Sequence, residues 1–318
     1  MGRCRGLSLL SGGLDSMLAV RVLERAGAEV ECVAFCTPFF GDARARAAAA
    51  ALGVRLRSVD FLDDEVSLLE NPPHGFGGAV NPCIDCHALM IRRAGEIADR
   101  EGFDFVATGE VLGQRPMSQN AHSLSVVEKS SGLVGRLVRP LSAKLLAPTR
   151  PETEDRLDRE SLLDISGRSR ERQIALAAEF GITDYPSPAG GCRLTEDAYG
   201  RKLRDLMEHE GLRLPGSGAD GERPPVNREL VELLSVGRRF RLPDGSGVIL
   251  GRDAGENALL RTRSGTVLQP PDGMVGPVAL VPSVKSDADL ALAAKIVEAW
   301  CRGTTEAERA PYKRFQLT

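Results

Sequence analysis

The segment Ser11-Gly12-Gly13-Leu14-Asp15-Ser16 combines residue types that bind a phosphate group. It falls between a predicted strand at 4–10 and a predicted helix at 16–25. Paired glycines let backbone N–H groups approach an anion closely, and a helix directs the positive end of its dipole at that anion. The Ser11 and Ser16 hydroxyls add donors, whereas the Asp15 carboxylate needs a cation such as Mg²⁺ between itself and the phosphates. We therefore expect a nucleotide and Mg²⁺ here, the alternative being a tight turn in which Ser11 caps the helix.

Three cysteines are the second set of residues that could carry chemistry. Cys83 and Cys86 lie just before a predicted helix at 87–100, whose N-terminus would favour their thiolates, and Cys192 follows in a glycine-rich turn at 188–193. Three thiols at one site suit a [4Fe–4S] cluster with one open iron, or zinc with His87 as fourth ligand. They also suit a persulfide on one cysteine with another as the resolving thiol. The plainer alternative is a structural zinc corner at the first two cysteines, with the third uninvolved.

The elements that would position these residues alternate between strand and helix. Two successive β-α-β units imply a parallel sheet with helices on both faces, which is an α/β fold. Ligands bind at the carboxyl ends of the strands in such sheets, so Cys36, near the end of the second strand, is a candidate to line the site. The cysteines Cys4, Cys32, Cys36 and Cys301 are expected to be structural, and lining the site is the alternative for Cys36. The apolar pattern places strands at 4–10, 31–35, 55–61 and 103–108 and helices at 16–25, 42–52 and 87–100.

The composition changes at 211–225, where glycine, proline and charged residues are typical of a linker. We expect a catalytic domain at 1–212, a linker at 213–226 and a small α+β domain at 227–318. That last domain holds 13 basic and 11 acidic residues, a net charge of +2 against −5 for the rest of the chain. It is therefore the more basic part, with predicted strands and a helix at 239–242, 248–251 and 287–300.

The overall composition is that of an ordinary globular protein. The 318 residues are 42% hydrophobic and 27% charged, and the net charge of −3 gives no global attraction to nucleic acid. No apolar run reaches the ~18 residues of a membrane span, and the N-terminal segment lacks a signal-peptide pattern. Seven cysteines, an odd number, argue against an extracellular disulfide framework. We therefore expect a cytoplasmic protein with no membrane partner.

The hexapeptide at 11–16 resembles the signature of the PP-loop ATP pyrophosphatases, which have an adenine nucleotide alpha hydrolase-like fold. That family cleaves ATP between its α and β phosphates and passes AMP to a carbonyl oxygen. The resemblance implies an ATP contact at each residue of the loop except Leu14, and a catalytic role for Asp15. The ATP-binding positions implied are Ser11, Gly12, Gly13, Asp15 and Ser16.

The segments NPCIDCH at 81–87 and VATGEVLGQRPMSQ at 106–119 resemble the tRNA-specific 2-thiouridylases. This second resemblance implies catalytic cysteines at Cys86 and Cys192, and nucleotide contacts at Thr108 and Gly109. With Cys83 added, the set resembles the thiolases in which three cysteines hold a [4Fe–4S] cluster. The chain departs from the thiouridylase pattern at Glu110, where that family has histidine.

The C-terminal segment resembles the RNA-binding domain called NFACT-R, through Val236-Gly237-Arg238 and GRDAGEN at 251–257. Together the resemblances imply ATP-dependent thiolation of a tRNA uridine, with sulfide or a persulfide carrier protein as the sulfur donor. The alternatives are an adenylylating enzyme that delivers sulfur or nitrogen to a small metabolite, and a non-catalytic RNA-binding protein. A homodimer is compatible with the sequence.

Basic residues outside these motifs are further candidates. Lys144, in a loop near the rim of the predicted sheet, is expected to reach the β-phosphate of ATP. Arg168, Arg170 and Arg172 alternate along one segment, where they either neutralise released phosphates or form a solvated face.

Overall fold

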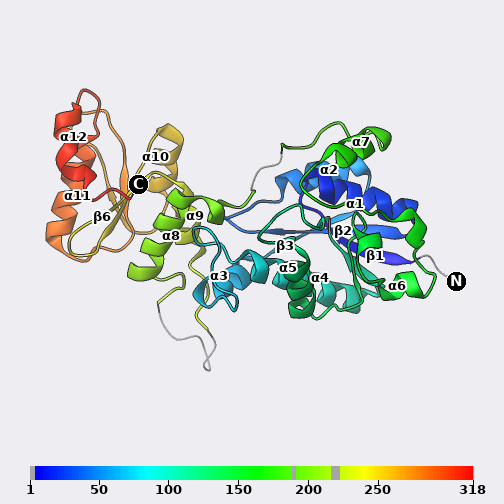
Figure 1. Ribbon diagram of the computed structural model, residues 1–318. Helices are drawn as coiled ribbons and strands as arrows, with labels where there is room; N and C mark the ends of the chain where they lie inside the picture. Colours follow the sequence, from blue (N-terminus) through cyan, green and yellow to red (C-terminus); the bar gives the residue numbers. More distant parts are fainter. Residues whose placement is uncertain (1–3, 188–190, 216–222, 318) are drawn as a thin grey trace. The chain divides into compact units, whose positions relative to one another are not determined.

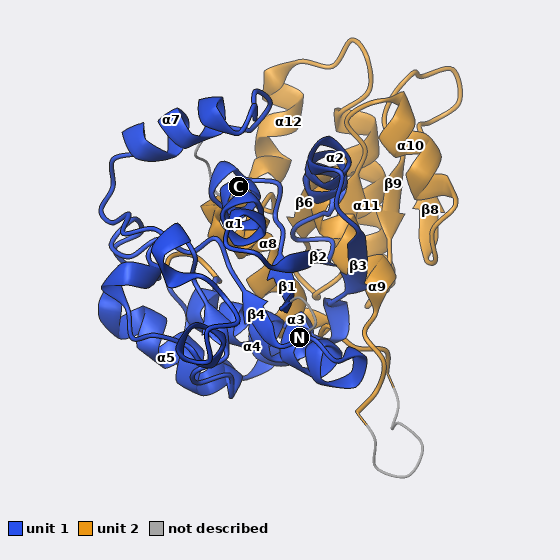
Figure 2. Cartoon of the chain, turned by 90° about the vertical axis from the view of Figure 1, so that its right-hand side faces the viewer, with its two compact units in different colours: residues 1–77, 81–192 blue, residues 78–80, 193–318 orange. Residues whose placement is uncertain are grey.

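The computed structural model describes residues 4–187, 191–215 and 223–317. The chain divides into two compact units, the first formed by residues 1–77 and 81–192 and the second by residues 78–80 and 193–318 (Figure 2). The segment at 188–190 of the predicted cysteine turn and residues 216–222 of the predicted linker lie outside the described residues. None of the helices described is long and apolar enough to cross a membrane.

The first unit is built on a five-stranded parallel sheet, in the order β3-β2-β1-β4-β5. Helices cover both faces, with α1, α2 and α7 on one side and α4 and α5 on the other (Figure 1). This confirms the predicted α/β class. The strands are β1 (Arg5–Leu9), β2 (Glu29–Cys36), β3 (Leu56–Asp60), β4 (Phe105–Ala107) and β5 (Leu137–Val138). The helices are α1 (Leu14–Arg25), α2 (Ala43–Leu52), α3 (Leu62–Glu70), α4 (Cys83–Glu101), α5 (Ala121–Ser131), α6 (Arg150–Thr153) and α7 (Glu171–Glu179), with 3₁₀ turns η1 (Ala143–Leu145) and η2 (Arg159–Ser161).

The sheet is buried because alternate side chains of its inner strands belong to two apolar cores, one on each face of the sheet. On β2, Cys32 and Ala34 pack with α1 and α2, whereas Val33 and Phe35 pack with α4. Successive side chains of a strand point to opposite faces, so a strand covered on both faces needs an almost continuous apolar run. The run CVAF in the sequence meets that need.

The strand order reverses direction between β1 and β4, and ligands of open α/β sheets bind at such a reversal. β1 pairs with β2 on one side and with β4 on the other, with Ser8 opposite Ala107. The chain leaves the two strands toward opposite sides of the sheet, so a crevice forms at their carboxyl ends. Residues 11–16 follow β1 at that edge, and Thr108 and Gly109 follow β4.

The second unit contains an antiparallel sheet in the order β6-β7-β9-β8. Helix α11 packs on the face that carries Phe240, whose ring lies 5.3 Å from that of Trp300, and α10 packs on the other face. This confirms the predicted small α+β domain. Its strands are β6 (Arg238–Arg241), β7 (Gly247–Leu250), β8 (Thr266–Leu268) and β9 (Ala279–Val281). Its helices are α8 (Asp197–His209), α9 (Arg228–Glu232), α10 (Ala254–Arg261), α11 (Asp287–Ala299) and α12 (Glu306–Lys313), with 3₁₀ turns η3 (Arg193–Thr195) and η5 (Leu233–Ser235).

Two local features differ from the sequence prediction. Helix α4 begins at Cys83, so the two cysteines lie inside its first turn rather than before it. The described flanks of the predicted linker pair with each other, since the Leu214 N–H donates to the carbonyl of Pro225 at 2.9 Å. The predicted boundaries at 1–212, 213–226 and 227–318 remain a prediction.

Candidate nucleotide and thiol site

The loop at 11–16 is held in close contact with its neighbours. Gly12 has a φ of +77°, and a Cβ there would overlap the backbone of Arg44 at the start of α2. At Gly109 a Cβ would lie 2.6 Å from the backbone nitrogen of Ser16. Only glycine fits both positions, so backbone rather than side chains surrounds the start of α1, as phosphate binding requires.

The serine hydroxyls of the loop hydrogen-bond within it. Ser16 Oγ donates to the carbonyl of Gly13 at 2.8 Å, and the Gly13 N–H donates to Ser11 Oγ at 3.3 Å. The N-cap of α1 is Gly13, without a side-chain capping bond. The simpler expectation that Ser11 caps this helix is therefore wrong, because the helix begins two residues later.

Asp15 is held by a chain of two amides that the sequence did not reveal. Gln114 Nε2 donates to Asp15 Oδ2 at 2.8 Å, and Gln173 Nε2, on α7, donates to Gln114 Oε1 at 3.3 Å. Asp15 Oδ1 and Arg170 Nε are both buried without a partner among the described residues. Burial raises the pKa of Asp15, while the Gln114 hydrogen bond and the charges of Arg170 and Arg115 oppose that rise. A buried acceptor and a buried donor left unpaired fit a cation and a phosphate respectively.

Replacing Gln114 with alanine should raise the Mg²⁺ concentration needed for ATP turnover by ~10–100-fold, because Asp15 loses the donor that orients it. The Mg²⁺ dependence of AMP formation measures this. Gln269→Ala, which removes a side chain bonded to Arg261 in the second unit, is the matched control. An unchanged Mg²⁺ dependence in Gln114→Ala would show that Asp15 does not act through a metal.

Cys86 is buried against a carboxylate from another helix. Its Sγ donates to Glu65 Oε2, on α3, at 3.0 Å, and Glu65 is fully buried. Burial raises the pKa of Cys86 well above its ordinary value, and the charges of Glu65, Cys192 and Cys83 raise it further. Burial likewise raises the pKa of Glu65 to about 7. The predicted stabilisation of the thiolate by the helix N-terminus is outweighed here by desolvation.

The three predicted cysteines lie near one another, since the charges of Cys83 and Cys192 both act on Cys86. Burial raises the pKa of Cys83, and the hydrogen bond with Asn81 and the charge of Arg115 lower it. The same Arg115 charge acts on Asp15. One guanidinium is therefore close to both the phosphate loop and the thiols.

Cys83, Cys86 and Cys192 were predicted to hold a cluster or, with His87, zinc. The residues described contain no group of three His, Cys, Asp or Glu side chains that could hold a metal ion. His87 Nδ1 lies 3.3 Å from Glu110 Oε1, a contact that leaves Nε2 as the ring atom that could ligate zinc, so the zinc alternative stays a prediction. The thiols have the chemistry of cluster ligands, and a [4Fe–4S] cluster on Cys83, Cys86 and Cys192 stays a prediction.

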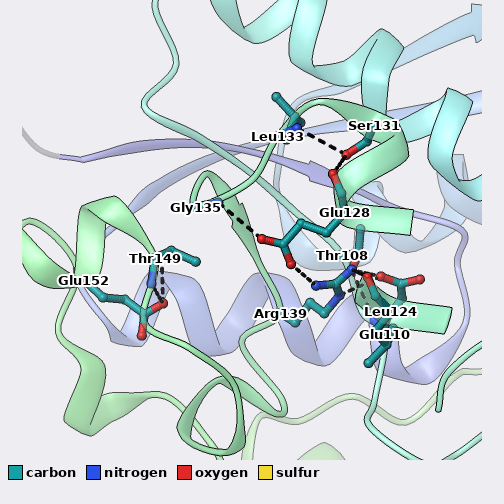
Figure 3. A network of polar contacts seen from close by, with 10 residues as sticks. All are labelled: Thr108, Glu110, Leu124, Glu128, Ser131, Leu133, Gly135, Arg139, Thr149 and Glu152. Atoms are coloured by element: carbon teal, nitrogen blue, oxygen red, sulfur yellow. Dashed lines mark hydrogen bonds and ion pairs between the residues drawn. The ribbon is translucent and has the colours of Figure 1, made fainter. Parts of the chain in front are cut away.

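Glu110, the departure from the thiouridylase pattern, belongs to a buried ion-pair network. Arg139 Nε donates to Glu110 Oε2 at 2.9 Å and Arg139 Nη1 donates to Glu128 Oε2 at 2.9 Å, so the guanidinium lies between two carboxylates (Figure 3). Burial would raise the pKa of Glu110, but the His87 hydrogen bond and the Arg139 charge lower it to about 2. Thr108 Oγ1 also donates to Glu110, at 3.0 Å. Glu110 thus supports the strand end that carries Thr108.

The last candidates to place are Lys144 and the cysteines outside the predicted thiol site. Lys144 Nζ, in η1, donates to the carbonyl of Glu160 at 2.8 Å and lies 3.1 Å from its carboxylate. Its contact with the β-phosphate stays a prediction. Burial raises the pKa of Cys4 to about 11 and of Cys32 to about 12, as expected of inert thiols. Cys36 Sγ donates to the carbonyl of Val59 at 3.5 Å.

The fold is α/β, and the loop at 11–16 that is predicted to bind phosphate follows the first strand. Residues 2–144 match the family model described as thiamine biosynthesis protein (ThiI), and residues 237–310 match the NFACT protein RNA binding domain. The resemblance to thiolating PP-loop proteins with an NFACT-type C-terminal domain is thereby confirmed.

Individual relatives carry related names. A probable tRNA sulfurtransferase of Caldanaerobacter subterraneus is 34% identical over 142 residues, which cover 42% of this chain and 35% of the relative. A tRNA-specific 2-thiouridylase MnmA of Chloroflexus aurantiacus is 25% identical, covering 80% of this chain and 74% of the relative. A solved structure of a 4-thiouridine synthetase with RNA and bound ATP is 22% identical, covers 56% of this chain and 52% of its own, and has a TM-score of 0.36, too low to carry an argument. The chain spans 35–42% of the length of the sulfurtransferases that it matches first.

Proposed function

We propose that this protein thiolates a uridine of tRNA at the expense of ATP. The observation that carries the proposal is Arg115, whose charge acts on Asp15 of the phosphate loop and on Cys83 of the thiol group. A base activated by AMP at the loop would thus meet a sulfur nucleophile without leaving the site. The names of the matched relatives, and the RNA-binding domain model matched by the C-terminal segment, agree with this substrate.

ATP is the substrate of the first step, and the loop provides what binding it needs. The phosphates would lie against the backbone at Gly12 and Gly13, with Arg170 Nε as a donor to them. Asp15 Oδ1 would hold Mg²⁺, which supplies charge neutralisation between the carboxylate and the phosphates. The uridine carbonyl oxygen attacks the α-phosphate, pyrophosphate leaves, and the base carries AMP on that oxygen.

The second step replaces the AMP-bearing oxygen with sulfur. Sulfide attacks the activated carbon and AMP leaves with the oxygen, so no electrons are transferred. If a carrier protein instead loads a persulfide on Cys86 or Cys192, its outer sulfur attacks the carbon. The other thiol then breaks the S–S bond and forms a disulfide, which an external thiol reductant must reopen. Glu65, bonded to Cys86 Sγ, is placed to hold the thiol proton.

A [4Fe–4S] cluster is the alternative way to present sulfide, and Cys83, Cys86 and Cys192 would be its ligands. Because the described residues contain no preassembled metal site, the steps above use the thiols alone. Iron and acid-labile sulfide, measured on protein purified without oxygen, decide between the two routes. About four irons per chain, lost in Cys83→Ala, would favour the cluster.

The decisive experiment incubates the protein with ATP, sulfide and an unmodified tRNA transcript and analyses the nucleosides. We expect thiouridine and one AMP per thiouridine from the wild type. If the sulfur is carried on a cysteine persulfide or on a cluster, Cys86→Ala and Cys192→Ala should still release AMP but form no thiouridine; if sulfide attacks the base directly, both variants should still form it. Cys301→Ala, a cysteine of the second unit, should behave as wild type in either case. Absence of thiouridine with the wild type would overturn the proposal. A cytoplasmic location, where thiols stay reduced, is part of it.

A further inference from the structure

The second unit holds four positively charged side chains that act on one another. Lys202 lies on α8, Arg193 on η3, Arg239 on β6 and Arg252 just before α10. The charges of the three arginines all act on Lys202, so the four side chains form one group, called here the Lys202 cluster. These residues come from four separate elements, and two of them, Arg193 and Lys202, precede the segment that matches the NFACT domain.

Arg239 is a buried cation whose donors are not satisfied. It is only 5% exposed, and its Nε and Nη2 have no hydrogen-bond partner among the described residues. The charges of Glu210 and Asp205 act on Arg239, but the hydrogen bonds that these carboxylates accept come from Arg241, at 3.0 Å to Asp205 and 2.8 Å to Glu210. An adjoining cavity of about 10 Å³ has room for one water, which would satisfy a donor but not balance the charge.

The positive charges of Lys202 and Arg193 are likewise not paired with a carboxylate among the described residues. The half-buried Lys202 side chain makes no hydrogen bond or ion pair with any residue that the structure describes. Burial lowers the pKa of Lys202 most, and the charges of Arg239, Arg252 and Arg193 lower it further. The charge of Glu256 raises it. Arg193 lies 5.8 Å from the ring of Tyr199, one turn before Lys202 on α8.

Arg252 has a carboxylate partner, since its Nε donates to Glu256 at 2.9 Å. Asp205 and Glu210 together offset the charges of Arg239 and Arg241, so the positive charges of Lys202 and Arg193 are the ones left without a carboxylate partner among the described residues. Like charges held together without a counter-ion destabilise a fold, and a fully buried, unpaired guanidinium does so most. A bound anion would remove that cost, and its charge-assisted hydrogen bonds are of the strong kind.

We propose that the Lys202 cluster binds a backbone phosphate of RNA. Lys202, Arg193 and Arg252 would contact the phosphate, and Arg239 would add a buried positive charge beneath it. RNA is the source favoured by the observations, because Arg239 and Arg252 lie in the segment that matches an RNA-binding domain. Helix α8 would then extend the RNA contact beyond that domain. The inference deepens the proposed function and rests on its RNA substrate.

The first test measures binding of the full-length chain to an unmodified tRNA transcript, without ATP, over a range of salt concentrations. Lys202→Met should weaken binding by ~5–10-fold near 0.1 M salt and reduce the salt slope by about one, the effect of losing one phosphate contact. Lys295→Met is the matched control, because Lys295 is exposed on α11, which packs on the other face of the sheet. Equal binding by the two variants would overturn the proposal.

The second test separates a binding role from a structural one. In the absence of RNA, Lys202→Met should keep or raise the melting temperature, because it relieves repulsion by three arginines. A lower melting temperature, accompanied by weaker binding, would mean that Lys202 serves the fold and would contradict the proposal. RNA should raise the melting temperature of the wild type more than that of the variant.

The inference and the proposed function fail in different ways. If the wild type forms no thiouridine but Lys202→Met still lowers affinity and salt slope, the phosphate site stands and the thiolation proposal fails. If the wild type thiolates tRNA but Lys202→Met binds it as Lys295→Met does, only the phosphate site fails.

Discussion

Gly109→Ala should lose ATP-dependent AMP formation almost completely, by ~100-fold or more. The new Cβ would lie 2.6 Å from the Ser16 backbone nitrogen and 2.7 Å from the Asp15 carbonyl carbon, and neither atom belongs to a flexible side chain. The start of α1 must then shift, which displaces the backbone N–H groups meant for the phosphates. A displacement of ~1 Å costs on the order of 100-fold in rate. Pyrophosphate or AMP release, measured at saturating ATP, gives the result.

The control for this substitution is Gly41→Ala. A Cβ at Gly41 would meet nothing within 4 Å, and its φ is not in the left-handed region, so the same chemical change should leave turnover and stability unaltered. Circular dichroism on both variants separates a displaced loop from an unfolded chain. If a folded Gly109→Ala variant turned over ATP at the wild-type rate, the strand ends of β1 and β4 would not form the nucleotide site.

Glu110→Gln should destabilise the protein by about 3 kcal/mol at neutral pH. Burial would raise the pKa of Glu110, but the His87 hydrogen bond and the Arg139 charge outweigh it and lower the pKa from 4.5 to about 2. A folded pKa below the unfolded one contributes stability that is present above pH 4.5 and is lost as the pH falls toward 2. Denaturant unfolding of wild type and variant across pH 7 to 3 measures this, and the difference should shrink as the pH falls.

Glu128→Gln is the comparison for Glu110→Gln. Both carboxylates accept from Arg139, but the Glu128 side chain is 25% exposed against 6% for Glu110, so solvent screens its loss. We expect the smaller destabilisation from Glu128→Gln. A pH-independent difference between wild type and Glu110→Gln would contradict the assignment of the lowered pKa.

Apolar periodicity predicted the parallel sheet and its helices because strands buried on both faces leave continuous apolar runs, such as that of β2. The phosphate loop was predictable because its glycines and serines are contiguous. The partners of that loop were not, since Gln114 and Gln173 are 59 residues apart in sequence and lie together only through the packing of α7 on α1. A polar residue inside an apolar helix face, as Gln173 is on α7, was the available signal.

The thiol site likewise contains contacts that the sequence alone could not predict. The spacing of Cys83 and Cys86 indicated shared chemistry, but helix α3, which supplies Glu65, was not predicted. The sequence could not reveal that burial, rather than the helix dipole, controls the pKa of Cys86, because burial depends on residues far along the chain. Glu110 is similar, since its role follows from Arg139, the arginine of the sequence Val138-Arg139-Pro140.

The contacts of helix α8 determine where a stable fragment of the second unit should begin. Asp205 and Glu210, from α8 and the residue after it, accept four hydrogen bonds from Arg241 on β6, between 2.6 and 3.0 Å. A fragment starting at residue 227 would lack those acids, whose charges act on the half-buried Arg241 and on the buried Arg239, and would leave both guanidinium groups without them. A fragment starting at residue 193 keeps them, so the compact second unit extends N-terminally beyond the segment that matches the NFACT domain model.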